Sequence, residues 1–259
     1  MTDRIRTSVE QGVCTITLNR PGALNALENT MIATIVAELE RAGADPDVRA
    51  ILLRGEGKAF CAGDDLVDMG TEEHPESPDL VERYSRGYPA IVERMLTLEK
   101  PIVASVRRYA LGAGLEMALA ADLIVAEPQA KLGLPFVLRG IAAGTSLLPK
   151  RAPVQLVQRM LYLGEMITAE DAHRMGVVGH LAEDEDVDEL ALATARRLAV
   201  GATRAIGLMK TALRTSETLS ARDALAVQVG ATAASVLTED FTEGKVAFTQ
   251  KRDPEFGGR

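Results

Sequence analysis

Apolar and polar residues alternate near the N-terminus, where Cys14, Ile16 and Leu18 are separated by threonines. This two-residue period is typical of a strand with one buried face. An earlier stretch, residues 5–9, has a similar character, and the turn-forming sequence around Gly12 lies between the two. The pattern therefore predicts an N-terminal β-hairpin.

A helical period follows the hairpin. From about residue 29, apolar residues recur every three or four positions, and Gly43 is the expected stop. Short apolar runs at residues 50–53, 101–106 and 123–126 have the length of buried strands. Strands that alternate with glycine loops and helices are typical of α/β proteins with parallel pairing.

Helical patterns dominate the second half of the chain. Residues 168–171 have the form of a helix N-terminus, with Gly176 as the expected stop. We expect a last strand at residues 177–181 and three or four helices in residues 187–259. By contrast, residues 70–87 are polar and contain two prolines, and we expect a mobile surface segment there.

The segment YALGAGLEMALAADL, residues 109–123, contains two glycines one residue apart, and three structural roles are possible for them. One possibility is a dinucleotide-binding fingerprint, but Met117 stands where the third glycine or alanine belongs, and the loop is far from the first strand. A second possibility is close packing of a helix on a strand. A third is an anion cradle, in which the amide of residue 113 at a helix N-terminus faces developing negative charge.

Glu116 favours a chemical role for this loop. It lies in the first turn of a predicted helix that is apolar on every side. A buried carboxylate costs several kcal/mol unless it is paired or neutralised. Burial would raise its pKa while the helix N-terminus would lower it, and such a balance suits a general base.

A second glycine loop, AFCAGDDL at residues 59–66, follows its own predicted strand. Its backbone could supply another amide, and two amides together can bind a thioester oxygen as it becomes an enolate. A base beside that oxygen could then take or return the α-proton. The two loops therefore indicate enolate chemistry.

Composition narrows the class of protein. A chain of 259 residues suits one large domain or a domain with an appendage, and the net charge of −8 argues against nucleic acid as a partner. No secretory signal and no apolar run of about 20 residues is seen, so we expect no membrane association. Cys14 and Cys61 form no disulfide framework, which favours the cytoplasm. No metal-site spacing appears, so no metal is expected.

Five ordered stretches resemble the enoyl-CoA hydratase/isomerase (crotonase) superfamily: TITLNRPGALNALENTM, AFCAGDDLVDM, KPIVASVRRYALGAGLEMALAADLIVA, ITAEDAHRMGVV and DFTEGKVAFTQKRDPEF. The resemblance implies an α/β fold, a spiral of ββα turns with a helical C-terminal region that forms trimers, often paired into hexamers. It divides the chain into a core at residues 1–195 and an oligomerisation region at 196–259. It also implies an acyl-CoA or enoyl-CoA substrate, with coenzyme A as part of the substrate and no separate cofactor.

The resemblance assigns roles to individual residues. The amides of Asp64 and Ala113 would form the oxyanion hole, and Glu116 falls on the first of the two catalytic glutamates of the hydratases. We expect only the amide of Asp64 to act, because a carboxylate beside an enolate is unfavourable. The implied positions that contact substrate or coenzyme A are Ala62, Asp65, Leu66, Val67, Gly112 and Phe136, and hydrogen bonds of the Asp65 side chain are expected to fix the loop.

Phe136 departs from the hydratase pattern, because it stands at the position of the second catalytic glutamate. Hydration needs a water held between two carboxylates, and a phenyl ring can neither accept nor donate that proton. We therefore expect proton transfer between carbons, such as double-bond isomerisation, in preference to efficient hydration. His74 is a candidate for a replacement acid, and an acyl-CoA-binding protein without catalysis is the alternative function.

Overall fold

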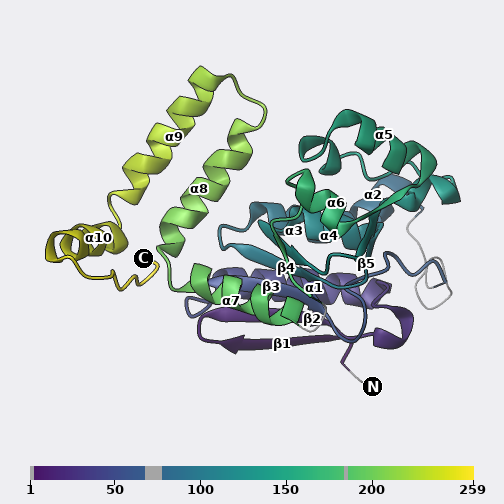
Figure 1. The fold of residues 1–259 in the computed structure, drawn as a ribbon, viewed down its shortest axis with the longest axis horizontal. Coiled ribbons are helices and arrows are strands. Elements are labelled where there is room, and N and C mark those ends of the chain that lie inside the picture. The colour runs from purple at the N-terminus through teal and green to yellow at the C-terminus, as the bar shows by residue number, and fades with distance from the viewer. Residues whose placement is uncertain (1–2, 68–77, 184–185) are drawn as a thin grey trace.

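A computed structural model of the chain describes residues 3–67, 78–183 and 186–259. A six-stranded sheet forms its centre, with the strand order β1-β2-β3-β4-β6-β9. The bounds of these strands are β1 (Ile5–Glu10), β2 (Val13–Leu18), β3 (Ala50–Gly55), β4 (Ile102–Val106), β6 (Leu123–Ala126) and β9 (His180–Leu181). Figure 1 shows the sheet in the lower part of the molecule.

The predicted hairpin is confirmed. β1 and β2 are antiparallel, with Ile5 opposite Leu18 and Glu10 opposite Val13. All other neighbours in this sheet are parallel. Parallel strands are covered on both faces, which explains why β3 and β4 are almost continuous apolar runs.

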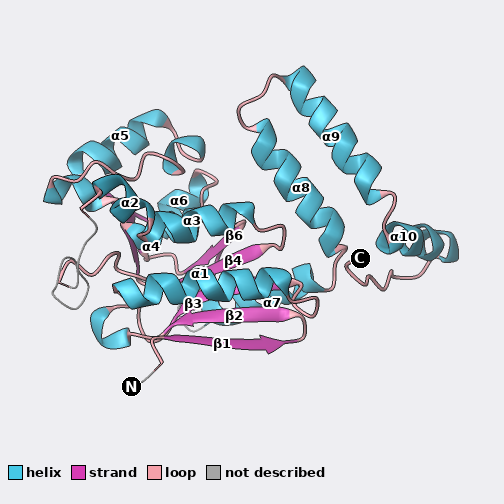
Figure 2. Cartoon of the chain, turned by 180° about the vertical axis from the view of Figure 1, so that it is seen from behind, coloured by secondary structure: helices cyan, strands magenta, loops and turns pink. Residues whose placement is uncertain are grey.

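Helices cover the two faces of the sheet with separate apolar cores (Figure 2). On one face pack α1 (Asn29–Ala44), α3 (Tyr88–Thr97) and α4 (Ala113–Ala120). On the other face packs α7 (Val187–Ala199), which places four buried residues against β2, β3, β4 and β6. All eight residues of α4 are buried, as its uniformly apolar sequence predicted.

A second sheet of three strands was not predicted. It consists of β5 (Tyr109–Leu111), β7 (Lys131–Gly133) and β8 (Met166–Thr168), in the order β5-β7-β8. Three residues are too few to show a periodic pattern, so only the tertiary structure reveals these strands. β5 leads directly into α4, and the small sheet therefore fixes the glycine loop between them.

The expectation for residues 70–87 was wrong in part. Residues 80–85 form a short helix, α2 (Leu80–Ser85), whose N-terminus is capped by the Asp79 side chain. None of the six residues of α2 is buried, so the helix lies on the surface as expected. The remaining residues of that segment up to 77, with His74 among them, lie outside the described residues.

Helices form the second half of the chain, as predicted. α5 (Val154–Leu163) and α6 (Ala169–Arg174) precede β9, and the Thr168 hydroxyl caps α6 by accepting a hydrogen bond from the Asp171 amide at 3.0 Å. α8 (Thr203–Ser216), α9 (Ala221–Ser235) and α10 (Glu239–Gln250) project away from the sheet (Figure 1). The expected boundary between the core and the oligomerisation region, after residue 195, lies within α7.

Ionic contacts attach α8 to the core. The Lys210 ammonium group is 2.6 Å from one carboxylate oxygen of Asp122, and the Arg214 guanidinium is 3.1 Å from the other. Arg214 also donates to the carbonyl of Ala120 at the end of α4. Cations are favourable at helix C-termini, so α8 stabilises the helix that carries Glu116.

Candidate active site

The two glycines of the segment 109–123 serve close backbone packing. Gly112 has a φ of 52° and a ψ of −124° at the start of α4, a conformation that favours glycine. A Cβ atom on Gly114 would lie 2.4 Å from the carbonyl oxygen of Cys61. The structure therefore supports the packing interpretation of this loop. The strand before it, β5, has only three residues and is not the first strand of a dinucleotide-binding unit.

The same packing joins the two glycine loops into one structure. The Cys61 amide donates to the carbonyl of Tyr109, and the Leu111 amide donates to the carbonyl of Cys61, each at 3.0 Å. Residues 59–64 thus run beside β5 like an added strand. The small side chain of Cys61 is fully buried.

Leu27 fixes the direction of the Asp64 amide. The Leu27 amide donates to the carbonyl of Gly63, and the Leu27 carbonyl accepts from the Asp65 amide, both at 2.8 Å. Along an extended chain, successive amides point to opposite sides. The Asp64 amide therefore points away from Leu27, toward the start of α4.

Ala113 brings the second amide to this place. It is the first residue of α4, so its amide has no acceptor within the helix. A Cβ atom on Gly63 would lie 3.7 Å from the Ala113 nitrogen. The Asp64 and Ala113 amides thus come from adjoining backbones, an arrangement that can bind one oxygen with partial negative charge.

Glu116 is as buried as its sequence context predicted, with 1% of its surface exposed. One carboxylate oxygen accepts a hydrogen bond from the Ser146 hydroxyl at 3.1 Å. The other oxygen is buried and has no hydrogen-bond partner among the described residues. Burial raises the pKa of Glu116, while the Ser146 hydrogen bond opposes this shift. A buried carboxylate with a raised pKa and one oxygen free of hydrogen bonds can accept a proton from a bound molecule.

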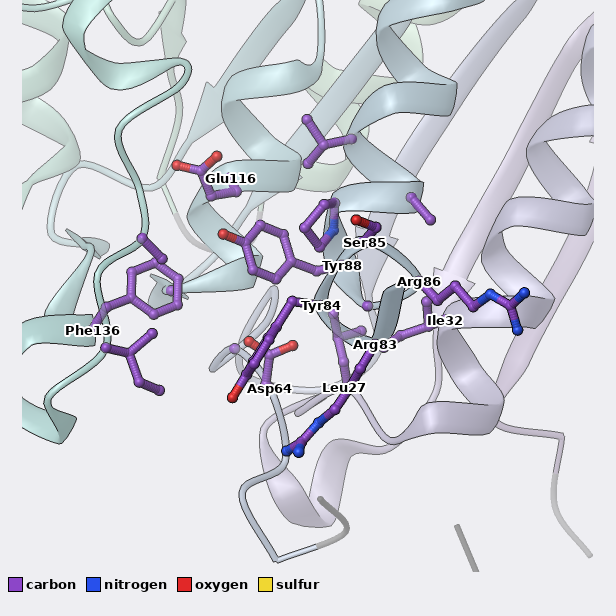
Figure 3. Close-up of a pocket in the computed structure, with 18 of the residues that line it drawn as sticks. Leu27, Ile32, Asp64, Arg83, Tyr84, Ser85, Arg86, Tyr88, Glu116 and Phe136 are labelled. Carbon is purple, nitrogen blue, oxygen red and sulfur yellow. The ribbon is translucent and has the colours of Figure 1, made fainter. Parts of the chain in front are cut away.

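Phe136 lies beside the glycine loop, within the 3₁₀ helix η2 (Pro135–Arg139). Its ring stacks on that of Tyr88, with 6.0 Å between the ring centres and 17° between the planes. Figure 3 shows the Tyr88 hydroxyl directed toward Glu116, with the buried Phe136 ring beside that of Tyr88. Burial, Glu116 and Asp64 all raise the pKa of Tyr88, so this hydroxyl keeps its proton.

These groups line one cleft of about 1850 Å³. Of the residues expected from sequence, those that line it are Ala62, Asp64, Leu66, Gly112, Glu116 and Phe136. Asp65 instead holds its own loop, because its carboxylate accepts from the Val67 amide at 2.9 Å and pairs with Arg20 at 2.5 Å. Val67 is 86% exposed outside the cleft, and Ala113 is buried behind its wall.

Two residues that line the cleft were missed in the sequence. Tyr88 lies 28 positions before Glu116, and Ser146 lies 30 positions after it. Neither belongs to the two glycine loops at residues 59–66 and 109–123 or to a periodic pattern that marks chemistry. The single available signal for Ser146 was its place in the turn after Phe136.

Within residues 3–67, 78–183 and 186–259, no three His, Cys, Asp or Glu side chains are grouped so as to hold a metal ion. Across the same residues, no helix has the length and apolar character needed to cross a bilayer.

Known proteins are similar to this chain in both sequence and fold. A family model described as enoyl-CoA hydratase/isomerase matches residues 8–259. The chain is 35% identical over 262 residues to 1,2-epoxyphenylacetyl-CoA isomerase of Escherichia coli (strain K12), with 100% of both chains covered. It is 36% identical to 2,3-dehydroadipyl-CoA hydratase of the same strain, with 97% of this chain and 98% of that protein covered. The crystal structure of an enoyl-CoA hydratase from Polaromonas sp. JS666 gives a TM-score of 0.90 at 27% identity, covering 97% of this chain and 99% of the other.

Proposed function

Since the chain belongs to the enoyl-CoA hydratase/isomerase family, we propose that it moves a proton on an acyl- or enoyl-CoA thioester through an enolate. In this proposal the amides of Asp64 and Ala113 bind the thioester oxygen, and Glu116 is the acid/base. The observation that carries it is the buried carboxylate of Glu116, one turn along the helix whose first amide is that of Ala113.

The proposed step begins with an ionised Glu116. Its free oxygen takes the proton from the α-carbon, and the electron pair of that C–H bond moves into a carbon–carbon double bond. The thioester oxygen becomes negative and accepts hydrogen bonds from the two amides, which are stronger in this state than in the thioester. The protonated Glu116 then returns its proton to the same carbon or to the γ-carbon.

Phe136 supports isomerisation in preference to hydration. In this proposal the ring takes the place of the second hydratase carboxylate and cannot hold a water, and it stacks on Tyr88. A 3-enoyl thioester needs no water, because the α-proton leaves and the γ-carbon gains one. The Tyr88 and Phe136 rings also favour an apolar acyl group near Glu116.

Rates on 3-enoyl-CoA and 2-enoyl-CoA substrates test the proposal, for the wild type and for Glu116→Gln. We expect isomerisation by the wild type, weak hydration, and a loss of about 10²–10⁴-fold in the glutamine variant, which is the contribution of a general base. Full activity of Glu116→Gln would show that Glu116 is not the base. Brisk hydration by the wild type would show that Phe136 does not prevent addition of water.

A non-catalytic acyl-CoA-binding protein is the second candidate. Phe136 at the place of the second hydratase glutamate favours it, while the buried, unpaired oxygen of Glu116 opposes it. Binding of a CoA thioester without turnover of 3-enoyl or 2-enoyl substrates would support this candidate. Release of product from either substrate would exclude it.

For residues 196–259 we propose assembly of the chain into a homotrimer or a dimer of trimers. Large apolar side chains are exposed on α8–α10 and their connections, and three examples are Leu213 at 72%, Leu237 at 86% and Phe248 at 87%. Exposed apolar groups gathered on one projecting unit mark an association surface. Sedimentation of the wild type and of a Leu237→Glu/Phe248→Glu variant tests this, with a monomeric wild type as the outcome against it.

A further inference from the structure

The Ser146 hydroxyl lies between the buried carboxylate of Glu116 and solvent. Its oxygen is 3.1 Å from one oxygen of Glu116, and Glu116 is 1% exposed whereas Ser146 is an exposed residue. Both residues line the same cleft. Among the described residues, the other oxygen of Glu116 has no hydrogen-bond partner. The hydrogen bonds of the carboxylate therefore lead to solvent through Ser146.

The loop that carries Ser146 is held in place on both sides of the hydroxyl. Gly144 before it is buried and has a left-handed φ of 80°, and a Cβ atom there would lie only 3.0 Å from neighbouring leucine side chains. Leu147 after it is 8% exposed and packs in the main apolar core. Thr145 and Ser146 stay exposed between these two anchors. The position of the hydroxyl is thus fixed by packing.

A carboxylate that serves as acid and base must hold a proton for part of each turnover. Once Glu116 has taken the α-proton, it can return that proton to the substrate or lose it to solvent. Its burial leaves no direct path to water, so the second route needs an intermediary. A serine hydroxyl can serve, because it donates one hydrogen bond and accepts others. It donates to the ionised carboxylate and can accept from the protonated one.

We propose that the Ser146 hydroxyl is a proton relay between Glu116 and solvent. The carboxyl group of Glu116 first turns about its last side-chain bond, a soft torsion, so that its O–H faces Ser146. That O–H bond breaks as its proton binds to the serine oxygen, and the serine's own proton passes to a water molecule. The reverse steps bring a solvent proton to Glu116, and the serine is unchanged. This inference rests on the proposed function and makes Ser146 a positioning residue that acts through Glu116.

The relay creates two routes to the product of isomerisation. On one route the γ-carbon receives the same hydrogen that left the α-carbon, and on the other it receives a hydrogen from solvent. The share of the two routes reports how fast Glu116 exchanges its proton before it returns it. Tyr88 is the competing intermediary, since Figure 3 shows its hydroxyl directed toward Glu116.

The experiment uses 3-hexenoyl-CoA that carries deuterium at both α positions, in ordinary water. Deuterium at the γ-carbon of the 2-enoyl product is measured by NMR and mass spectrometry at low conversion. Ser146→Val and Ser146→Thr form a matched pair of nearly equal size that differ in the hydroxyl. Thr145→Val makes the same change at the neighbouring exposed position of the cleft. Because both routes start from one intermediate, the ratio of retained to exchanged label does not depend on how much of the enzyme is active.

We expect Ser146→Val to raise the ratio of retained to exchanged label by about tenfold or more, the kinetic effect of losing one hydrogen bond to a charged group. Ser146→Thr and Thr145→Val should stay close to the wild-type ratio. Equal ratios in Ser146→Val and Ser146→Thr, complete retention by the wild type, or a rise in Tyr88→Phe instead would overturn the relay. If the wild type does not isomerise this substrate, or Glu116→Gln isomerises it equally fast, the proposed function fails instead.

Discussion

Gly114→Ala tests whether close packing of the two loops creates the proposed oxyanion hole. In the structure, the added Cβ atom would lie 2.4 Å from the Cys61 carbonyl oxygen and 2.8 Å from its Cβ atom. Both are too short for a carbon contact, and the nearer atom belongs to the backbone. The first turn of α4 must therefore move away from residues 59–64 until the shorter distance is at least 3.0 Å.

The magnitude follows from two opposing terms. Alanine in place of glycine favours a helix by about 1 kcal/mol, and overpacking in a dense core costs about 1–3 kcal/mol. We expect a net loss of unfolding free energy of up to about 2 kcal/mol. The shift also moves the Ala113 amide away from that of Asp64, and loss of one oxyanion donor lowers kcat by about 10²–10³-fold.

Gly230→Ala is the matched control, because Gly230 also lies within a helix, α9, and no atom would be found within 4 Å of its added Cβ. Urea unfolding and the isomerisation rate are measured for both variants. Gly230→Ala should gain up to about 1 kcal/mol and keep its activity. Wild-type kcat in a stably folded Gly114→Ala protein would refute the argument, since the two amides would then not depend on this contact.

Three other changes have defined outcomes. Ser146→Ala removes the hydrogen bond that lowers the pKa of Glu116, so the acidic limb of the pH–rate profile should shift to higher pH, and an unchanged limb would exclude Ser146 as a positioning residue. Burial raises the pKa of Glu116, so ionisation of its carboxyl group disfavours the folded state. Glu116→Gln should therefore be more stable than the wild type at pH 8 but not at pH 4. An equal difference in the free energy of urea unfolding at both pH values would contradict this. Asp122→Asn leaves the buried Lys210 and the partly buried Arg214 without their counter-ion and should cost about 3–5 kcal/mol. Asp171→Asn breaks an exposed ion pair with Arg174 and should cost much less; similar losses of stability in the two variants would refute a structural role for Asp122.

Local patterns in the sequence were sufficient for most helices and for the long strands. Alternation predicted the hairpin, a helical period predicted α1, and short apolar runs predicted β3, β4 and β6. For the region of α7–α10 the sequence predicted three or four helices. The burial of Glu116 also followed, because every neighbour along its helix is apolar and all of α4 is enclosed. These features depend on residues that are close in the chain.

The three-residue strands of the small sheet were beyond such reasoning, and so was α2. The strands are too short for a period, and α2 has only six residues and no buried face that a period could mark. Both are nevertheless needed for the site. β5 places α4 beside residues 59–64, and α2 closes one side of the cleft.

The sequence by itself was enough to propose enolate chemistry, since two glycine loops and a carboxylate in an apolar helix could be identified from neighbouring residues. Only the tertiary structure decided which groups share that carboxylate's surroundings. Ser146 bonds to Glu116 across 30 positions, Phe136 stacks on Tyr88, and Asp64 faces the cleft from another loop. Such contacts join distant segments, and their geometry is set by how helices and strands pack, which no local period records.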